Sequence, residues 1–312
     1  MSFKGIGIAI SKLTRRPTEG DTIERLLEKS MPSIVESITT TRLGIIKFGV
    51  VVEDHNPIHL LENKAEKVKL KTTPIMGVHT LAFAEQFAQR VIDTINKENN
   101  KENNNQGNLL IRGIAIKFKD FAYPEESIRW GINGYEQTKD ESISLNIEGK
   151  VKGVNIATVS AKIGLRYFEK KPLPPDKKPL PLDKIIFSTT YAFDQERFDD
   201  FKECIGANGE PYPLTALPGL FIPSTLLKLL RERTLKMTGI NSYMDLNYFN
   251  KPDIGKSVRV DIYSYTRPPR KISKDPDPEQ YLYSKIKATC SQGQKLLIAG
   301  DITCIVPVDL NI

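Results

Sequence analysis

Proton-transfer side chains gather in one short window of this 312-residue chain. All three histidines lie between residues 55 and 79, and Asp54 directly precedes the first of them. Asn56 and Pro57 separate Asp54 from His59, and the residue before a proline is pushed towards extended backbone. The turn can therefore direct the Asp54 carboxylate and the His59 imidazole towards one point. Because carboxylates and imidazoles are common general acids and bases, the pair predicts proton transfer through a shared water molecule.

The segment Asp54-x-Asn56-Pro57-Ile58-His59 resembles the signature of the MaoC-like, type 2 (R-specific) enoyl-thioester hydratases and dehydratases, whose fold is the hotdog. The resemblance implies that Asp54 and His59 hold the catalytic water and that Asn56 helps to shape the loop. It also implies that a glycine at the start of the central helix offers its N–H to the thioester carbonyl. Gly77 falls at the family's usual distance from His59.

The chain departs from the family pattern at two places. Val52-Glu53 stands where the family usually has Ser-Gly, and Met76-Gly77 stands where it usually has His-Gly. The second departure removes a helper side chain but keeps the backbone donor. We expect Met76 and Val78, on either side of Gly77, to contact the substrate.

Simpler interpretations compete with these roles. Asp54 and His59 could be ordinary turn residues, because Asp accepts backbone N–H bonds and Asn-Pro is common turn chemistry. Gly77 could serve only close packing of a helix on a sheet. The catalytic interpretation is favoured by the motif together with the helix-then-sheet order that follows it. A helix N-terminus also presents unpaired N–H groups towards developing negative charge.

The remaining titratable residues of the window are assigned minor roles. His55 is expected to be an exposed turn residue, and His79 a first-turn helix residue near the site entrance. Alternation places Glu53 on the side opposite Asp54. A metal cluster of the histidines with Asp54 is disfavoured, because no cysteine joins them and hydration needs no metal. We therefore expect no metal and no cofactor.

Composition indicates a globular chain of one large or two ordinary domains, with 39% hydrophobic and 27% charged residues. No apolar run approaches the roughly 20 residues that a membrane helix needs. Three widely spaced cysteines without a CxxC pattern favour a reducing compartment, so we expect a cytoplasmic protein.

The formal net charge of +7 favours polyanionic partners. The basic residues are dispersed and are not interleaved with aromatic residues, which disfavours nucleic acid. An acyl-CoA or acyl carrier protein thioester fits the charge better, with no membrane span. Whether the chain also forms a homodimer stays open.

Periodicity predicts one long helix followed by a sheet. From Gly77, apolar residues recur at helical spacing up to Ile95, and four alternating segments between residues 110 and 167 read as strands. A short helix is expected over 23–29, a β-rich stretch over 33–41, and a solvated polar loop over 97–107.

A proline-rich stretch divides the chain. Residues 169–183 are expected to form a stiff linker between an N-terminal hotdog, 1–168, and a C-terminal one, 184–312. The order of elements repeats after the linker, with a helix over 222–237 and strands over 257–266, 281–291 and 296–306. The predicted fold class is α+β, a double hotdog.

The second copy is expected to be degenerate. Matching Phe121-Ala122-Tyr123-Pro124 to Phe249-Asn250-Lys251-Pro252 supports the repeat, and matching Pro57 to Pro211 places Asn208 and Pro213 at the positions of the catalytic pair. Both proton-transfer groups would then be lost, and Tyr212 and Asn208 would be pocket-lining or plain turn residues. We expect this half to accommodate a long acyl tail, lined by Leu217, Leu220 and Phe221.

The predicted activity is that of a hydro-lyase, reversibly hydrating trans-2-enoyl thioesters to (R)-3-hydroxyacyl thioesters in fatty-acid metabolism, as the resemblance implies. Two alternatives stay open. One is a hotdog acyl-thioesterase, and the other is a non-catalytic acyl-binding or dehydratase-partner subunit.

Overall fold

The structure is a computed structural model that describes residues 23–25, 27–28, 34–101, 108–137, 143–165, 185–207, 216–234, 240–266 and 281–307. The expected linker, 169–183, lies outside these ranges, as do Asn208, Pro211, Tyr212 and Pro213. Residues 23–25 and 27–28 are helical, in agreement with the helix expected over 23–29.

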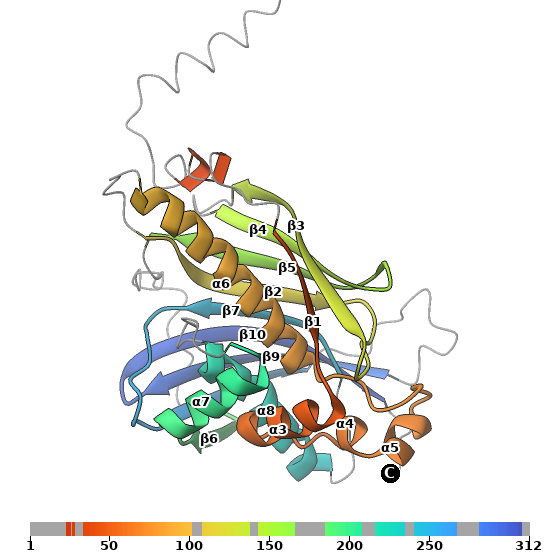
Figure 1. The fold of residues 1–312 in the computed structure, drawn as a ribbon. Coiled ribbons are helices and arrows are strands. Elements are labelled where there is room, and N and C mark those ends of the chain that lie inside the picture. The colour runs from red at the N-terminus through yellow and green to blue at the C-terminus, as the bar shows by residue number, and fades with distance from the viewer. Residues whose placement is uncertain are drawn as a thin grey trace, which may run out of the picture.

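One antiparallel sheet of ten strands spans both halves of the molecule (Figure 1). Its spatial order is β1-β3-β4-β5-β2-β7-β10-β9-β8-β6, so the order in the second half mirrors that in the first. The strands are β1 (Val35–Thr39), β2 (Leu110–Phe118), β3 (Ser127–Gln137), β4 (Ile143–Val151), β5 (Val154–Gly164), β6 (Phe187–Tyr191), β7 (Ile240–Tyr248), β8 (Val258–Thr266), β9 (Tyr281–Gln292) and β10 (Lys295–Pro307).

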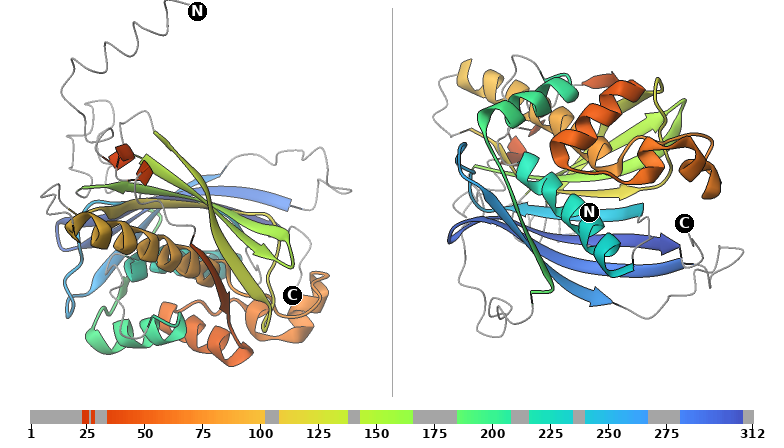
Figure 2. Two further views of the ribbon diagram at one scale, coloured as in Figure 1. Left: turned by 45° about the horizontal axis from the view of Figure 1, so that its top comes forward. Right: turned by 90° about the horizontal axis from the view of Figure 1, so that it is seen from below.

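Each half packs one long helix against its own part of the sheet. Helix α6 (Gly77–Lys101) contacts β2, β4 and β5, and α8 (Ala216–Thr234) contacts β6, β8, β9 and β10. The two helices lie on one face of the sheet and contact each other (Figure 2). The apolar face of α6 is fully buried, as its helical spacing predicts. This arrangement is the predicted double hotdog.

Shorter helices cover the end of the molecule where the motif lies. They are α3 (Arg42–Val52), α4 (Pro57–Leu60) and α5 (Glu62–Lys67) in the first half, and α7 (Gln195–Cys204) in the second. Helix α3 packs on α7 across the junction of the halves (Figure 1).

The halves join through the pairing of β2 with β7. Ala115 lies opposite Asp245, and Gly113 opposite Asn247. A Cβ on Gly113 would lie 2.6 Å from the Leu246 carbonyl oxygen, so only glycine allows the strands to approach this closely. The junction is therefore continuous sheet rather than a contact between two separate sheets.

The two copies contain equivalent turns, but their residues do not correspond as the match of Pro124 with Pro252 predicts. The observed correspondence differs from that match by two residues. The N–H of Glu125 donates to the Thr40 carbonyl (2.9 Å), and the N–H of Gly255 donates to the Phe193 carbonyl (2.7 Å). Glu125 and Gly255 both have positive φ, so they occupy equivalent turn positions. The repeat is confirmed in its element order, whereas that residue match is wrong.

The ends of α3 and α7 also correct the match made for the motif, by one residue. Asp54 donates its N–H to the Gly49 carbonyl, and Ala207 donates to the Lys202 carbonyl, both at 2.8 Å. The preceding residues, Glu53 and Gly206, both have positive φ. Ala207, and not Asn208, is therefore the counterpart of Asp54, and it too lacks a proton-transfer group.

Other differences from the sequence analysis concern boundaries and one missed strand. Helix α6 continues to Lys101 and takes in the first residues of the expected polar loop over 97–107, of which 102–107 lie outside the described ranges. Helix α8 begins at Ala216 rather than at residue 222. Strand β7, the strand of the second half that pairs with β2 at the junction, was not predicted.

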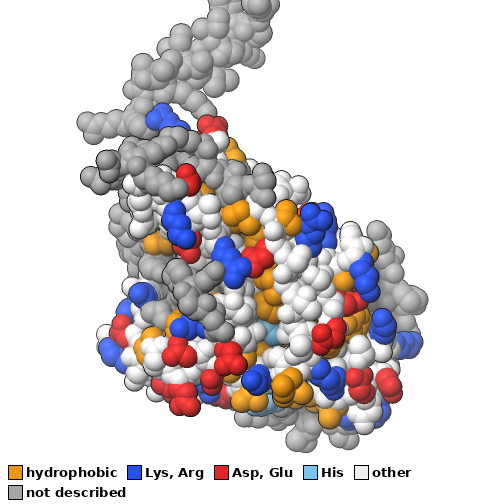
Figure 3. All heavy atoms as spheres, in the orientation of Figure 1, with side chains coloured by type: hydrophobic (Ala, Val, Ile, Leu, Met, Phe, Trp, Pro, Cys, Tyr) orange, Lys and Arg blue, Asp and Glu red, His pale blue; other side chains and the backbone are white. Residues whose placement is uncertain are grey.

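The face drawn in Figure 3 carries basic and acidic side chains interspersed with one another. On this face the net charge of +7 is not gathered into a single basic patch. No helix within the described ranges has the length and hydropathy needed to cross a membrane.

Candidate active site

A cavity of about 150 Å³ lies at the N-terminus of α6 and brings together Asp54, His59 and Gly77. Both halves line it. The first half contributes most of the wall, and Leu227 and Ser242 come from the second. The other lining residues are Asn56, Ile58, Ile75, Thr80, Phe118, Lys119, Asp120, Phe121 and Ala122.

Asp54 is aimed into the cavity by the end of α3. Glu53 closes the helix in the left-handed conformation (φ 56°), and the chain then turns sharply. The Asp54 side chain is only 2% exposed, and its Oδ1 accepts a hydrogen bond from the Asn56 N–H at 3.0 Å. A buried carboxylate needs hydrogen-bond donors, and the turn supplies this one.

His59 is held by the short helix α4. Asn56 caps this helix by accepting from the Ile58 N–H at 3.4 Å, and Pro57 occupies its first position, as these residue types favour. His59 is buried, and its Nδ1 lies 2.9 Å from the Pro74 carbonyl oxygen. Because a carbonyl can only accept, Nδ1 carries the proton, and in the neutral ring Nε2 is the acceptor.

Burial keeps His59 neutral. Burial lowers its pKa below the usual 6.5, while the Asp54 charge and the hydrogen bond to the Pro74 carbonyl act in the opposite direction. Burial dominates, so the ring is uncharged near neutral pH and retains its acceptor nitrogen.

Gly77 begins α6 and lines the cavity. Within the described ranges no group accepts a hydrogen bond from this N–H, as expected for the first residue of a helix. A Cβ at Gly77 would lie 3.3 Å from Phe118 Cζ, so glycine also permits tight packing there. The helix terminus thus offers a donor to a developing negative charge.

Arg42 holds together the loop that supports His59, a role that no sequence pattern indicated. Its guanidinium donates to the Leu60 carbonyl at 3.0 Å and to the Thr73 hydroxyl, and it pairs with Glu62 at 3.0 Å. Thr73 directly precedes Pro74, so Arg42 helps to fix the carbonyl that orients the imidazole.

The lining from Phe118 to Ala122 was also missed. This loop follows β2, and the Ala122 carbonyl accepts the Ile75 N–H at 2.8 Å, which brings the loop over the start of α6. No local sequence signal marks such a contact, because the two segments meet only after the sheet has formed.

Several residues predicted to bind substrate lie away from this cavity. Met76 and Val78 are fully buried, and Met76 packs on α3, where its Cε would clash with any Cβ on Gly49. The three residues expected to line an acyl pocket in the second half are fully buried in the core, because the early start of α8 places them under the sheet. They are Leu217, Leu220 and Phe221.

The outcomes for the neighbouring residues differ. His55 is exposed, as predicted. The prediction that His79 lies near the entrance is wrong, because its ring is fully buried, stacked on Phe48 at 3.9 Å and tilted on Phe83 at 4.4 Å. Burial lowers the pKa of His79 to about 3, so it is an uncharged core residue. Glu53 points away from the cavity and pairs with the second half.

Comparison with known proteins agrees with the resemblance drawn from the motif. The model of the MaoC like domain family matches residues 27–104, a stretch that contains Asp54, His59 and Gly77. Members of that family are dehydratases. No curated protein matches the sequence.

Solved structures confirm the fold over nearly the whole chain. A putative MaoC domain protein dehydratase from Chloroflexus aurantiacus J-10-fl is 9% identical with a TM-score of 0.58, covering 88% of this chain and 94% of that one. A MaoC-like dehydratase from Phytophthora capsici is 7% identical with a TM-score of 0.52, covering 90% and 97%.

A conserved hypothetical protein from Mycobacterium tuberculosis, described as having a double hotdog fold, is 7% identical with a TM-score of 0.54. It covers 90% of this chain and 98% of that one. At such identities the likeness is one of fold, and it confirms the double hotdog.

Proposed function

We propose that this protein is a hydro-lyase that reversibly hydrates trans-2-enoyl thioesters to (R)-3-hydroxyacyl thioesters. The observation that carries the proposal is that Asp54, His59 and the N-terminus of α6 reach one small cavity. A carboxylate, a neutral imidazole and a backbone donor are the groups that this addition of water requires.

In the proposed mechanism, Asp54 orients the water and takes its proton. His59 accepts a hydrogen bond from the same water through Nε2, and its Nδ1–H donates to the Pro74 carbonyl, which fixes the tautomer. His59 thereby helps to deliver the proton that Asp54 has taken from the water to the α-carbon. Water adds to the β-carbon, and negative charge develops on the thioester oxygen. The N–H of Gly77 stabilises that oxygen.

The proposed mechanism uses groups of the chain itself. A well-placed donor to the developing oxyanion contributes about 3 kcal/mol in the transition state. Positioned proton transfer typically adds about 10²–10⁴-fold in rate. These effects act in a buried site, where water competes little for the same groups.

The substrate carrier is proposed to be CoA or an acyl carrier protein, in fatty-acid metabolism. The positive net charge supports a phosphate-bearing or acidic carrier. A cytoplasmic location stays part of the proposal and rests on the spacing of the cysteines.

A thioesterase is the second candidate, because a buried carboxylate could activate water towards the carbonyl carbon instead. The presence of His59 with its acceptor nitrogen in the same cavity favours hydration. A non-catalytic acyl-binding subunit is disfavoured, because such a subunit would not need either proton-transfer group.

Incubation with crotonyl-CoA and with a long-chain enoyl-CoA tests the proposal. We expect loss of the enoyl absorbance and formation of the (R)-3-hydroxyacyl product without release of free thiol. Thiol release from a saturated acyl-CoA would indicate the thioesterase instead. Binding of acyl-CoA without either reaction would indicate the non-catalytic subunit.

A further inference from the structure

Glu53, the residue before Asp54, has a backbone conformation that its residue type disfavours. Its φ of 56° is in the left-handed region, which glycine adopts freely and other residues only at a cost. The equivalent residue of the second half is glycine, Gly206, with φ 71°. The first half therefore keeps a strained residue at the point from which the Asp54 turn departs.

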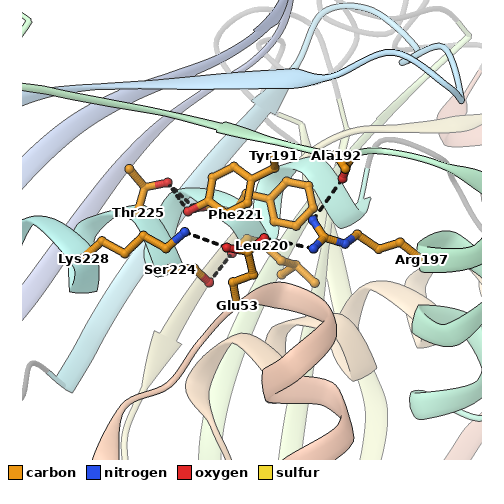
Figure 4. A network of polar contacts seen from close by, with 9 residues as sticks. All are labelled: Glu53, Tyr191, Ala192, Arg197, Leu220, Phe221, Ser224, Thr225 and Lys228. Atoms are coloured by element: carbon orange, nitrogen blue, oxygen red, sulfur yellow. Dashed lines mark hydrogen bonds and ion pairs between the residues drawn. The ribbon is translucent and has the colours of Figure 1, made fainter.

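Two cations from the second half hold this residue (Figure 4). Glu53 Oε1 accepts from Arg197 Nη2 at 2.9 Å, and its Oε2 accepts from Lys228 Nζ at 2.6 Å. All three side chains are between 21% and 31% exposed, so water screens the pairs only in part. Burial alone would raise the pKa of Glu53, but the two cations lower it below its usual value.

Both cations are also held by contacts within the second half. Arg197 donates to the Ala192 carbonyl at 3.0 Å and lies 5.5 Å from the centre of the Phe221 ring. Lys228 lies 4.5 Å from the centre of the Tyr191 ring, which stacks on Phe221 at 4.4 Å. Figure 4 shows both cations converging on one carboxylate from α7 and α8.

The corresponding position in the second half, at the end of α7, has no side chain. The groove at the end of α7 is lined by β1, α3, α6 and Gly206, and it stays open as a cavity of about 470 Å³. A Cβ on Gly206 would meet nothing within 4 Å. Lys47 of α3 pairs with Glu203 of α7 in this groove at 3.5 Å, and both side chains are more than half exposed. A second pair in its lining, Arg90 with Glu36, joins α6 to β1. The carboxylate that pairs with two cations at the end of α3 therefore has no counterpart at the end of α7, where Gly206 stands.

We propose that Glu53 is a positioning residue for Asp54, clamped by Arg197 and Lys228 of the second half. The clamp offsets the strain of the left-handed residue and so fixes the direction in which Asp54 enters the cavity. This inference rests on the proposed function, in which Asp54 is a catalytic residue. It gives the second half, which has Ala207 in place of Asp54, a part in positioning the catalytic carboxylate.

Substitutions at Glu53 separate backbone strain from charge. Glu53→Ala keeps the strain and removes the clamp, so we expect kcat to fall by roughly tenfold or more with KM within about twofold. Glu53→Gly removes both, and because glycine adopts this conformation freely, most of kcat should return. Equal losses in the two variants would overturn the proposal.

The cations provide a second route that leaves Glu53 in place. The double variant Arg197→Gln/Lys228→Gln should lower kcat about as much as Glu53→Ala, and should have less than about a twofold effect in the Glu53→Gly background. Lys47→Ala is the matched control, because Lys47 joins the same two helices at the other groove; its kcat should stay within about twofold of wild type. A full effect of the double variant in the Glu53→Gly background would contradict the clamp.

Amide hydrogen exchange tests the clamp without any activity. The amides of Asp54 and Asn56 are hydrogen-bonded in the turn, and we expect them to exchange about tenfold faster in Glu53→Ala than in wild type or Glu53→Gly. Unchanged exchange would overturn the inference. A wild-type protein that does not hydrate enoyl thioesters would overturn the proposed function alone, because the exchange result would still decide the clamp.

Discussion

Asp54 and His59 are the buried titratable residues of the cavity, whereas the other titratable side chains of its lining, Lys119 and Asp120, are exposed. We expect Asp54→Asn and His59→Ala each to lower kcat by about two orders of magnitude or more, with the fold retained. Crotonyl-CoA hydration and circular dichroism measure the two properties. His55→Ala is the matched control, because this exposed imidazole is next to the same carboxylate. Near-normal hydration by a folded Asp54 or His59 variant would exclude that residue from the mechanism.

At the scale of residues, the motif predicted the reactive groups of the cavity but not the residues that hold them in place. Asp54 and His59 were paired from their types and spacing, and the family resemblance added Gly77. The roles of the Pro74 carbonyl and of Arg42 were not predicted. Every residue has a backbone carbonyl, and a single arginine in a helix forms no recognisable pattern. Ala207 was missed as the counterpart of Asp54, because a proline match gave the wrong register.

At the scale of elements, helix α6 places a carboxyl group against a strand of the other half. Glu85 is fully buried, and its Oε1 accepts from the Tyr248 hydroxyl of β7 at 2.8 Å. Its Oε2 has no hydrogen-bond partner in the part of the chain that the structure describes. Burial raises the pKa of Glu85 from 4.5 to about 8, although the bond from Tyr248 acts the other way.

The buried carboxyl of Glu85 predicts that the stability of the folded protein depends on pH. Between pH 4.5 and about 8 the Glu85 carboxyl is protonated in the folded protein and ionised in the unfolded chain. The contribution of Glu85 to the free energy of unfolding is therefore full below pH 4.5 and is lost as pH rises through about 8. The expected loss is about 1.4 kcal/mol per pH unit in this window. Thermal unfolding of wild type should therefore show a steeper fall in Tm over this range than Glu85→Gln. Glu98→Gln, an exposed change on the same helix, should leave the wild-type slope unaltered.

Periodicity predicted α6 and the strands β2 to β5, because each has one face buried and its apolar residues repeat accordingly. Strand β7 was missed although Met244 and Leu246 alternate with polar residues. Those polar residues are satisfied from the other half, where Lys162 donates to Asn247 at 2.9 Å and pairs with Asp245 at 3.5 Å. Such long-range partners are not visible in a local pattern.

At the scale of the whole molecule, the β2–β7 junction predicts the behaviour of an isolated half. A fragment of residues 1–168 would expose the β2 edge, whose backbone groups pair with β7 in the full chain. We expect this fragment to self-associate or to be poorly soluble in sedimentation experiments. A lysine substituted for Ala115, at the centre of that edge, should reduce the association. A stable, monomeric and fully active fragment would contradict the dependence of the first half on the second.

The placement of Glu53 opposite Gly206 has a consequence for how such a molecule can diverge. In an assembly of two identical chains, any change in one copy appears in both, so a glutamate and a glycine could not share one position. Tethering the copies removes that symmetry and makes their encounter unimolecular, independent of dilution. One copy can then lose its reactive side chains and acquire Arg197 and Lys228, while its sibling keeps the carboxylate that they bind.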